Sequence, residues 1–249
     1  MTDHGAVRLV HLDRPDSLNA FSTQLMDELC DVMLESAEAS AVTVLVLTGA
    51  GRAFTAGADL AEMGGGSDYQ ARHGFAGLLE AIIEFPKPFI IAVNGVGAGI
   101  GATICGLADL VYMADDARIK APFSTLGLTA EAGSTYTFPQ LMGRQRAAWF
   151  LWSSEWMDGA ECVAAGLALE SLPGAELLPH VLSKAEQLAA LPLASLMKTK
   201  ALMIEPHKAQ LRASFAAENR GLAELVGGPA NKQALAAFVD KRDPDFSSL

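Results

Sequence analysis

The amino-acid sequence predicts an α/β domain followed by a helical C-terminal region. Three observations carry this prediction. Short apolar, β-branched runs alternate with helical patterns through the first part of the chain, glycine-rich turns separate several of them, and only helical patterns remain after about Pro192. Strands that alternate with helices are typical of parallel sheets covered by helices. We therefore expect a core over residues 1–190 and a helical region over residues 191–249.

The elements of the core follow in order from apolar patterning. Val7–Leu12 is a predicted strand, and a turn-rich stretch separates it from the first helix. Ser22 precedes apolar residues at helical spacing and is the predicted N-cap of that helix. Val42–Leu47 is a continuous apolar run, as expected for a strand buried on both faces. Two further strands are predicted for the sequences FIIAV and LVYMA.

The C-terminal region contains three helical patterns. Two breaks are expected between them, one at Pro206 and one at the Gly-Gly-Pro sequence 227–229, because proline and glycine interrupt helices. The apolar faces of these helices need partners. Packing on the chain's own core is one account, and a subunit interface is the other.

Composition excludes several functional classes. The formal net charge is -11, from 18 Lys and Arg against 29 Asp and Glu, so a nucleic-acid partner is not expected. The cysteines are far apart and the histidines have no metal-ligand spacing, so neither a disulfide framework nor a metal site is expected.

The location predicted for the chain is the cytoplasm, since its first residues do not form a signal peptide. One uncharged segment, Phe89–Ala108, is long enough to cross a bilayer. Five glycines and Asn94 interrupt it, so we expect a buried strand, a turn and a buried helix there, and no membrane partner.

Two glycine-rich turns each precede a short helical pattern. The first is Ala56–Leu60, in which Asp59 is placed to begin a helix, and the second is Gly95–Gly101. Each turn leaves unpaired backbone N–H groups at the positive end of a helix. If the two ends converge, they form an oxyanion hole without a charged side chain. The alternative is that the glycines only permit tight turns.

The second turn has a further interpretation. Gly97–Ala102 satisfies a relaxed dinucleotide-binding fingerprint, with Asp115 or Asp116 at a tolerable distance for a ribose contact. The intervening helix is very short for that fold, and the first glycine turn is left unexplained. A nicotinamide enzyme therefore remains an alternative that predicts NAD binding.

Glu131 is the candidate for acid–base chemistry. It is the single carboxylate between Asp116 and Glu155, and no lysine or arginine lies within ten residues of it. An apolar environment raises the pKa of a carboxyl group toward the range that is useful for moving protons. The alternative is an ordinary solvated loop residue.

The motifs RPDSLNAFS, GAGRAFTAGADL and KPFIIAVNGVGAGIGATICGLADLVYMADDARIKAPFSTLGLTAEAGSTYTFPQLMG, with the ending AFVDKRDPDF, resemble the enoyl-CoA hydratase/isomerase (crotonase) superfamily. The resemblance covers nearly the whole chain. It implies a spiral core of repeated ββα turns and a helical C-terminal region used for trimerisation, as a homotrimer or a dimer of trimers. It also implies an acyl-CoA thioester substrate, and we expect no cofactor.

The resemblance also assigns roles to residues. The N–H groups of Ala58 and Ile100 would hold the thioester oxygen. Further positions would contact substrate, and these are Phe54, Ala56, Gly57, Asp59, Leu60, Gly99, Phe123 and Lys241. Lys241 would approach the nucleotide end of CoA, and the alternative for it is a solvated helix end.

One departure from the family pattern affects the expected reaction. The two glutamates that activate water in hydratases are matched here by Thr103 and Phe123. The sequence PFSTLGLTAEAGSTYTFP instead resembles the Δ3,Δ2-enoyl-CoA isomerase branch. This resemblance implies that Glu131 carries the proton between the two carbon atoms, and that the enzyme acts in fatty acid metabolism. The alternatives are a hydratase-like or other crotonase-family enzyme and a non-catalytic acyl-CoA-binding member.

Overall fold

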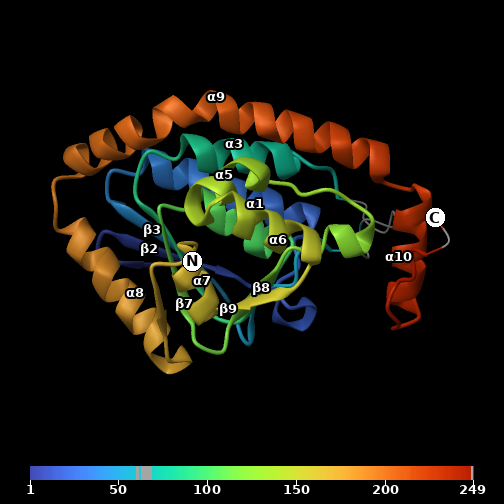
Figure 1. Cartoon of the computed structure of the whole chain (residues 1–249). Coiled ribbons are helices and arrows are strands. Elements are labelled where there is room, and N and C mark those ends of the chain that lie inside the picture. The colour runs from blue at the N-terminus through green and yellow to red at the C-terminus, as the bar shows by residue number, and fades with distance from the viewer. Residues whose placement is uncertain (60–61, 63–68, 248) are drawn as a thin grey trace.

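Two β-sheets form the centre of the computed structural model, which describes residues 1–59, 62, 69–247 and 249 (Figure 1). The first sheet has six strands in the order β1-β2-β3-β5-β7-β10, all parallel except β1. The second sheet has the order β4-β6-β8-β9, in which β9 is antiparallel. The strands of the first sheet are β1 (Thr2–His4), β2 (Val7–Leu12), β3 (Val44–Gly49), β5 (Phe89–Val93), β7 (Leu110–Ala114) and β10 (Glu170–Leu172). Those of the second are β4 (Ala53–Thr55), β6 (Val96–Ala98), β8 (Arg118–Lys120) and β9 (Trp156–Asp158).

Three strand pairs repeat along the chain and produce both sheets. In β3/β4, β5/β6 and β7/β8, the first strand joins the six-stranded sheet and the second joins the four-stranded sheet. Helical structure follows each pair: α3 (Gly74–Glu84), then α4 (Ile100–Thr103) with η2 (Ile104–Leu107), then η3 (Ser124–Leu126) with α5 (Ser134–Met142). This repetition is the ββα spiral that the resemblance implies, so the predicted fold class is confirmed.

The predicted strands agree with the structure, with one shift. β2, β5 and β7 have the predicted bounds, whereas β3 begins two residues later than the predicted strand Val42–Leu47 and ends at Gly49. Every residue of β3 and β5 is buried, as expected for strands covered on both faces. The helix α8 (Gly174–Ala189) packs on the six-stranded sheet, and its buried positions are apolar.

The first helix, α1 (Thr23–Glu38), begins as predicted. The side chain of Ser22 accepts a hydrogen bond from the Leu25 N–H at 3.1 Å. α1 packs beside α3, and α3 lies next to the long helix α9 (Leu193–Leu225) in Figure 1. The remaining helices are η1 (Pro15–Ser17), α6 (Arg144–Ser153), α7 (Gly159–Ala165) and α10 (Pro229–Val239).

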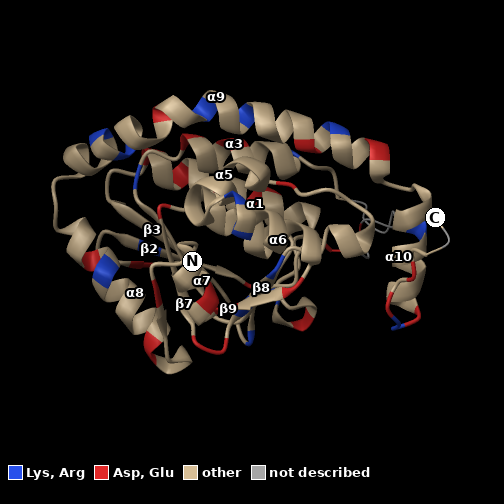
Figure 2. Cartoon of the chain, in the orientation of Figure 1, with Lys and Arg blue, Asp and Glu red and all other residues tan. Residues whose placement is uncertain are grey.

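The predicted break at Pro206 is wrong, because α9 continues through it. Pro206 lies on an exposed stretch of the helix, where water can satisfy the carbonyl that loses its N–H partner. Ion pairs also fix the helix on both sides of the proline. Lys200 pairs with Asp109 at 2.6 Å, Lys208 pairs with Glu84 at 2.7 Å, and Arg212 pairs with Glu80 and Glu84. Figure 2 shows charges of both signs along this helix.

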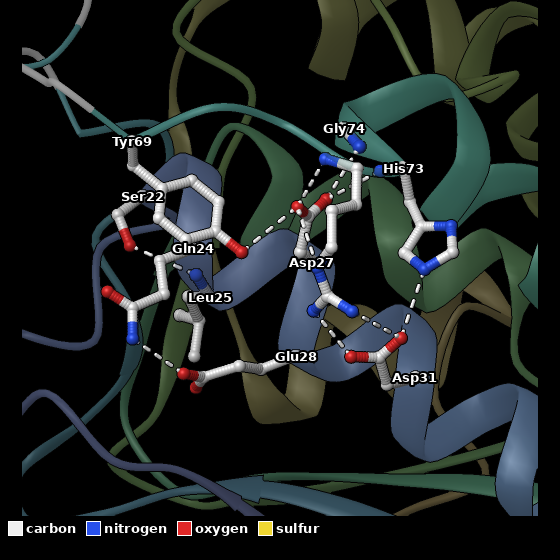
Figure 3. Close-up of polar contacts among 10 residues, drawn as sticks. Ser22, Gln24, Leu25, Asp27, Glu28, Asp31, Tyr69, His73 and Gly74 are labelled. Atoms are coloured by element: carbon white, nitrogen blue, oxygen red, sulfur yellow. Dashed lines mark hydrogen bonds and ion pairs between the residues drawn. The ribbon is translucent and has the colours of Figure 1, made fainter.

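The buried carboxylate of Asp27 holds the segment 69–74, which leads into α3. Asp27, on α1, accepts hydrogen bonds from the N–H groups of Arg72, His73 and Gly74 at 2.6, 2.9 and 2.7 Å (Figure 3). The Tyr69 hydroxyl is a fourth donor at 3.2 Å. Burial alone would raise the pKa of Asp27, but these donors hold the pKa well below its usual range. Asp27 therefore anchors the N-terminus of α3 to α1.

No helix in the described part of the chain is long and apolar enough to cross a membrane. The uncharged segment Phe89–Ala108, which is long enough to cross a bilayer, forms β5, β6, α4 and η2. Its buried apolar residues belong to the protein core.

Candidate active site

The first glycine turn follows β4 and is held by hydrogen bonds on one side. The Phe21 N–H donates to the Gly57 carbonyl at 2.7 Å, and the Asp59 N–H donates to the Phe21 carbonyl at 3.1 Å. In this parallel bridge the residue between the two contacts, Ala58, directs its own N–H away from Phe21. Gly57 has φ +96°, which few other residues adopt.

The second glycine turn follows β6 and begins α4. The Gly99 N–H donates to the Lys120 carbonyl at 3.0 Å, and the Gly99 carbonyl accepts from Ala102 and Thr103. Gly99 has φ +55° and is the N-cap of α4. Ile100 is the first residue of that helix, so its N–H has no partner within the helix.

The two turns are in contact with each other. β4 and β6 are parallel neighbours, so their carboxyl ends lie at the same edge of the sheet. A methyl group added at Gly57 would lie 2.8 Å from the Ala98 carbonyl oxygen and 3.8 Å from the Gly99 nitrogen. A methyl group added at Gly99 would lie 3.9 Å from the Gly57 Cα. Neither the Ala58 nor the Ile100 amide donates a turn or capping hydrogen bond among the described residues.

Glu131 lies in the loop between η3 and α5. Its backbone is fixed, because its carbonyl accepts hydrogen bonds from the Ser134 N–H at 3.1 Å and the Ser134 hydroxyl at 2.7 Å. Two consecutive left-handed residues, Ala132 and Gly133, then turn the chain into α5. α5 packs against η2, which continues from α4, so the loop and the second turn belong to one packed unit.

Burial makes Glu131 an unusual carboxyl group. Loss of solvation is the main cause, and the nearby charge of Glu218 adds to it; together they raise the pKa of Glu131 to about 7. Its carboxyl group forms no hydrogen bond or ion pair with the described residues. A carboxyl group of this kind exchanges protons readily near neutral pH.

The other residues predicted to contact substrate differ in their exposure to solvent and in their partners. Phe54 is fully buried in the core, so only its backbone is available to a ligand, whereas Ala56 is exposed. Asp59 forms an ion pair with Arg14 at 2.9 Å. Leu60 lies outside the described residues. Lys241 is exposed and lies after the end of α10.

A cavity of about 140 Å³ lies beside the first turn. It is lined by Phe21, Thr23, Met26, Ala58, Asp59 and Glu62. A larger cavity of about 440 Å³ lies around Trp149 and Trp156, and none of its described lining residues is a predicted site residue. The position of Ala58 at the smaller cavity is consistent with a ligand approaching the first turn.

Comparisons with known proteins identify the family. The family model described as enoyl-CoA hydratase/isomerase matches residues 2–248. The chain belongs to this family. Members of this family act on acyl-CoA thioesters, so the match points to an enzyme of the enoyl-CoA hydratase/isomerase type.

Relatives in the family carry different activities in their names. Enoyl-CoA delta isomerase 2 of Rattus norvegicus is 34% identical over 86% of this chain, which spans 56% of the rat protein. A probable enoyl-CoA hydratase of Rhodobacter capsulatus is 33% identical over 96% of this chain and 93% of its own length. A crystal structure of an enoyl-CoA hydratase/isomerase from Pseudoalteromonas atlantica covers 99% of this chain and 98% of its own, with 30% identity and a TM-score of 0.94.

The two positions that the resemblance matches to the hydratase glutamates hold no carboxylate. Thr103 is fully buried, and its hydroxyl donates to the Gly99 carbonyl at 3.3 Å. Phe123 is also buried, at the start of η3. Neither of these two side chains is able to activate water as a base.

Sequence reasoning missed two residues that shape the site. Asn19 donates to the carbonyls of Ala50 and Ala53 at 2.9 and 2.8 Å and so holds the approach to the first turn. Glu218 lies on α9, far from Glu131 in sequence, and is buried. Glu218 follows Leu211 and Phe215 at helical spacing, so the sequence places a charged residue on an apolar face of the helix. This pattern could have identified Glu218.

Adding one methyl group at Gly57 tests whether the contact between the turns matters. We expect Gly57→Ala to lower kcat/KM for an enoyl-CoA substrate by about 10² or more, because the displaced turn no longer aims the Ala58 N–H. Steady-state kinetics and the thermal midpoint are the measurements.

Gly5→Ala is the matched control. Gly5 also has a left-handed φ, +61°, but a methyl group there meets nothing within 4 Å. It therefore adds a methyl group at a left-handed backbone position without the steric conflict. Full activity in folded Gly57→Ala would show that the close approach is not required.

Proposed function

We propose that the protein is a Δ3,Δ2-enoyl-CoA isomerase that moves the double bond of a 3-enoyl-CoA to the 2 position. The observation that carries this proposal is the carboxyl group of Glu131, half-buried and with its pKa raised to about 7. A one-base proton shift needs one such group, whereas hydration needs a base that also positions water. Thr103 and Phe123 supply no second carboxylate. The relative named enoyl-CoA delta isomerase 2 supports this choice.

The proposed reaction begins at the thioester carbonyl. The N–H groups of Ala58 and Ile100 bind its oxygen from the two adjoining turns. The Glu131 carboxylate removes a proton from C2, and the electron pair forms a dienolate whose negative charge rests on the thioester oxygen. Backbone donors aimed at that oxygen stabilise the dienolate more than the ground state, and each contributes about 10²–10³ in rate.

The second half of the reaction returns the proton. The dienolate accepts a proton at C4 from the Glu131 carboxylic acid, which leaves the double bond between C2 and C3. Glu131 is a carboxylate again, so no net proton is taken up or released. A pKa near 7 suits both steps, because the group must be a competent base and then a competent acid.

Hydration of a 2-enoyl-CoA is the second candidate, since several relatives are named as hydratases. A non-catalytic acyl-CoA-binding role is the third. Incubation with 3-enoyl-CoA and with 2-enoyl-CoA separates them. Conjugation of the first substrate supports the isomerase, hydration of the second supports the hydratase, and binding without turnover of either supports the third.

The C-terminal region supports a proposal about assembly. Large apolar side chains are exposed on and around α9 and α10: Leu202, Met203, Leu225, Val226, Leu235, Phe238 and Val239. Apolar side chains gathered in this way are typical of surfaces that bind another protein. We propose that they form subunit contacts in a homotrimer or a dimer of trimers in the cytoplasm.

Glu131→Gln tests the assignment of the base. We expect this variant to lose about 10²–10⁴ in kcat for isomerisation, because the amide cannot take the C2 proton. In the wild type, kcat/KM should fall as the pH drops through about 7, since protonation removes the base.

The exposed Glu224, on α9, provides the control variant Glu224→Gln, which removes one negative charge without touching the site. It should keep wild-type kinetics. Turnover near the wild-type rate in folded Glu131→Gln would reject the assignment.

Lys241→Gln tests the proposed contact with the nucleotide end of CoA. We expect an increase of about 2–5-fold in the Kd for CoA at low salt, which fades as salt is added, because exposed ion pairs are weak and screened. The control is Lys232→Gln, at another exposed lysine on α10. Equal Kd values for the two variants, measured by titration calorimetry, would assign Lys241 to a solvated helix end.

A further inference from the structure

The buried carboxylate of Glu218 has no role in the reaction described above. It lies on α9, is 5% exposed, and belongs to the C-terminal region. Burial of a carboxylate is costly unless hydrogen bonds compensate it.

Glu218 binds the first residues of α5. It accepts hydrogen bonds from the Gly133 N–H at 2.7 Å, the Thr135 N–H at 3.0 Å and the Thr135 hydroxyl at 2.6 Å. These amides belong to the helix N-terminus that follows Glu131 directly. A free helix N-terminus stabilises a nearby carboxylate. Because Glu218 occupies these donors, they are not available to the Glu131 side chain.

The rest of the same face of α9 also lies along the Glu131 loop. A methyl group added at Gly133 would lie 2.4 Å from the Leu211 side chain and 2.6 Å from the Phe215 ring. A methyl group at Gly221 would lie 3.1 Å from the Thr129 side chain. α9 therefore contacts the chain on both sides of Glu131, and Glu218 is the polar group in the middle of that contact.

We propose that Glu218 is a positioning residue for Glu131: it ties the Glu131 loop to α9 through the first amides of α5 and keeps a negative charge beside the Glu131 carboxyl group. Its role in the reaction rests on the proposed function of Glu131, whereas the contacts themselves do not.

The charge has a direct consequence for Glu131. Burial is the main cause of the raised pKa of Glu131, and the charge of Glu218 raises this pKa further. A like charge disfavours the ionised form of its neighbour. Removal of the Glu218 charge should therefore lower the pKa of Glu131 and weaken it as a base.

The test compares Glu218→Gln with the wild type. The glutamine keeps a side-chain oxygen that accepts from Gly133 or Thr135 but removes the charge. The titration of Glu131 is followed by carbon NMR of protein labelled at the glutamate carboxyl groups, with its signal assigned by its loss in Glu131→Gln. We expect the midpoint to move from about 7 to lower pH by about one pH unit.

Two variants separate the charge from other effects. Glu224→Gln removes a charge from the exposed face of α9 and should leave the midpoint unchanged. Glu218→Asp keeps the charge and should keep the midpoint near that of the wild type. A purely structural role predicts the same Glu131 midpoint in folded Glu218→Gln as in the wild type, and that result would overturn the proposal.

The pH dependence of isomerisation gives an independent reading. The acidic limb of kcat/KM should move to lower pH in Glu218→Gln together with the NMR midpoint. If the wild type isomerises no 3-enoyl-CoA, the proposed function fails while the NMR shift still decides the inference. If the midpoint stays fixed while isomerisation proceeds, the inference fails and the proposed function survives.

A wild-type measurement covers the case in which Glu218→Gln does not fold. The Glu218 carboxyl carbon, whose signal is assigned by its loss in Glu218→Asp, should change its chemical shift near pH 7 as the neighbouring Glu131 titrates. This change should be absent in Glu131→Gln. A Glu218 signal that does not respond to the Glu131 titration in the wild type would overturn the proposal.

Discussion

The contact between two glycine turns is the constraint on which the site depends. Each turn leaves β4 or β6, adjacent parallel strands, and the small size of Gly57 lets the turn that carries Ala58 reach the turn that carries Ile100. A side chain at Gly57 would meet the Ala98 carbonyl at 2.8 Å. The repeated ββα units make this approach possible, because they bring the same position of successive repeats to one edge of the four-stranded sheet.

Backbone donors also explain how an acidic chain can stabilise an enolate. The net charge is -11, and the described residues of the two turns include no lysine or arginine. Main-chain amides at turn and helix starts supply positive potential without a charged side chain. In the proposed reaction the base is then free to be a carboxylate, and burial with a like-charged neighbour raises the pKa of Glu131 to about 7. In that reaction the backbone donors stabilise the negative charge that the base creates.

The C-terminal region contributes residues to the candidate site. α9 contributes Glu218, Leu211 and Phe215 to the loop that carries Glu131. α10 reaches the start of the same loop, where Asn231 donates to the Leu126 carbonyl at 2.8 Å. The predicted division into residues 1–190 and 191–249 follows the patterns of the sequence. Residues from the second part nevertheless contact the loop that carries Glu131 in the first.

Local patterns in the sequence predicted four strands of the six-stranded sheet and the Ser22 cap, because burial on both faces and capping chemistry leave clear signatures. The helix through Pro206 could not be predicted locally, since its continuity depends on ion pairs with α3 and Asp109. Glu218 was missed for a similar reason: its partners lie more than 80 residues away in sequence. The two turns were identified, but their contact follows from strand order, which no single motif contains.

The most direct test of the account is a crystal structure of the protein with a bound acyl-CoA analogue. The account predicts that the Ala58 and Ile100 nitrogens both lie about 2.7–3.1 Å from the thioester oxygen. It also predicts that the Glu131 carboxylate faces C2 and C4 of the acyl chain. A thioester oxygen bound by other groups, or a Glu131 side chain directed away from the acyl chain, would contradict it.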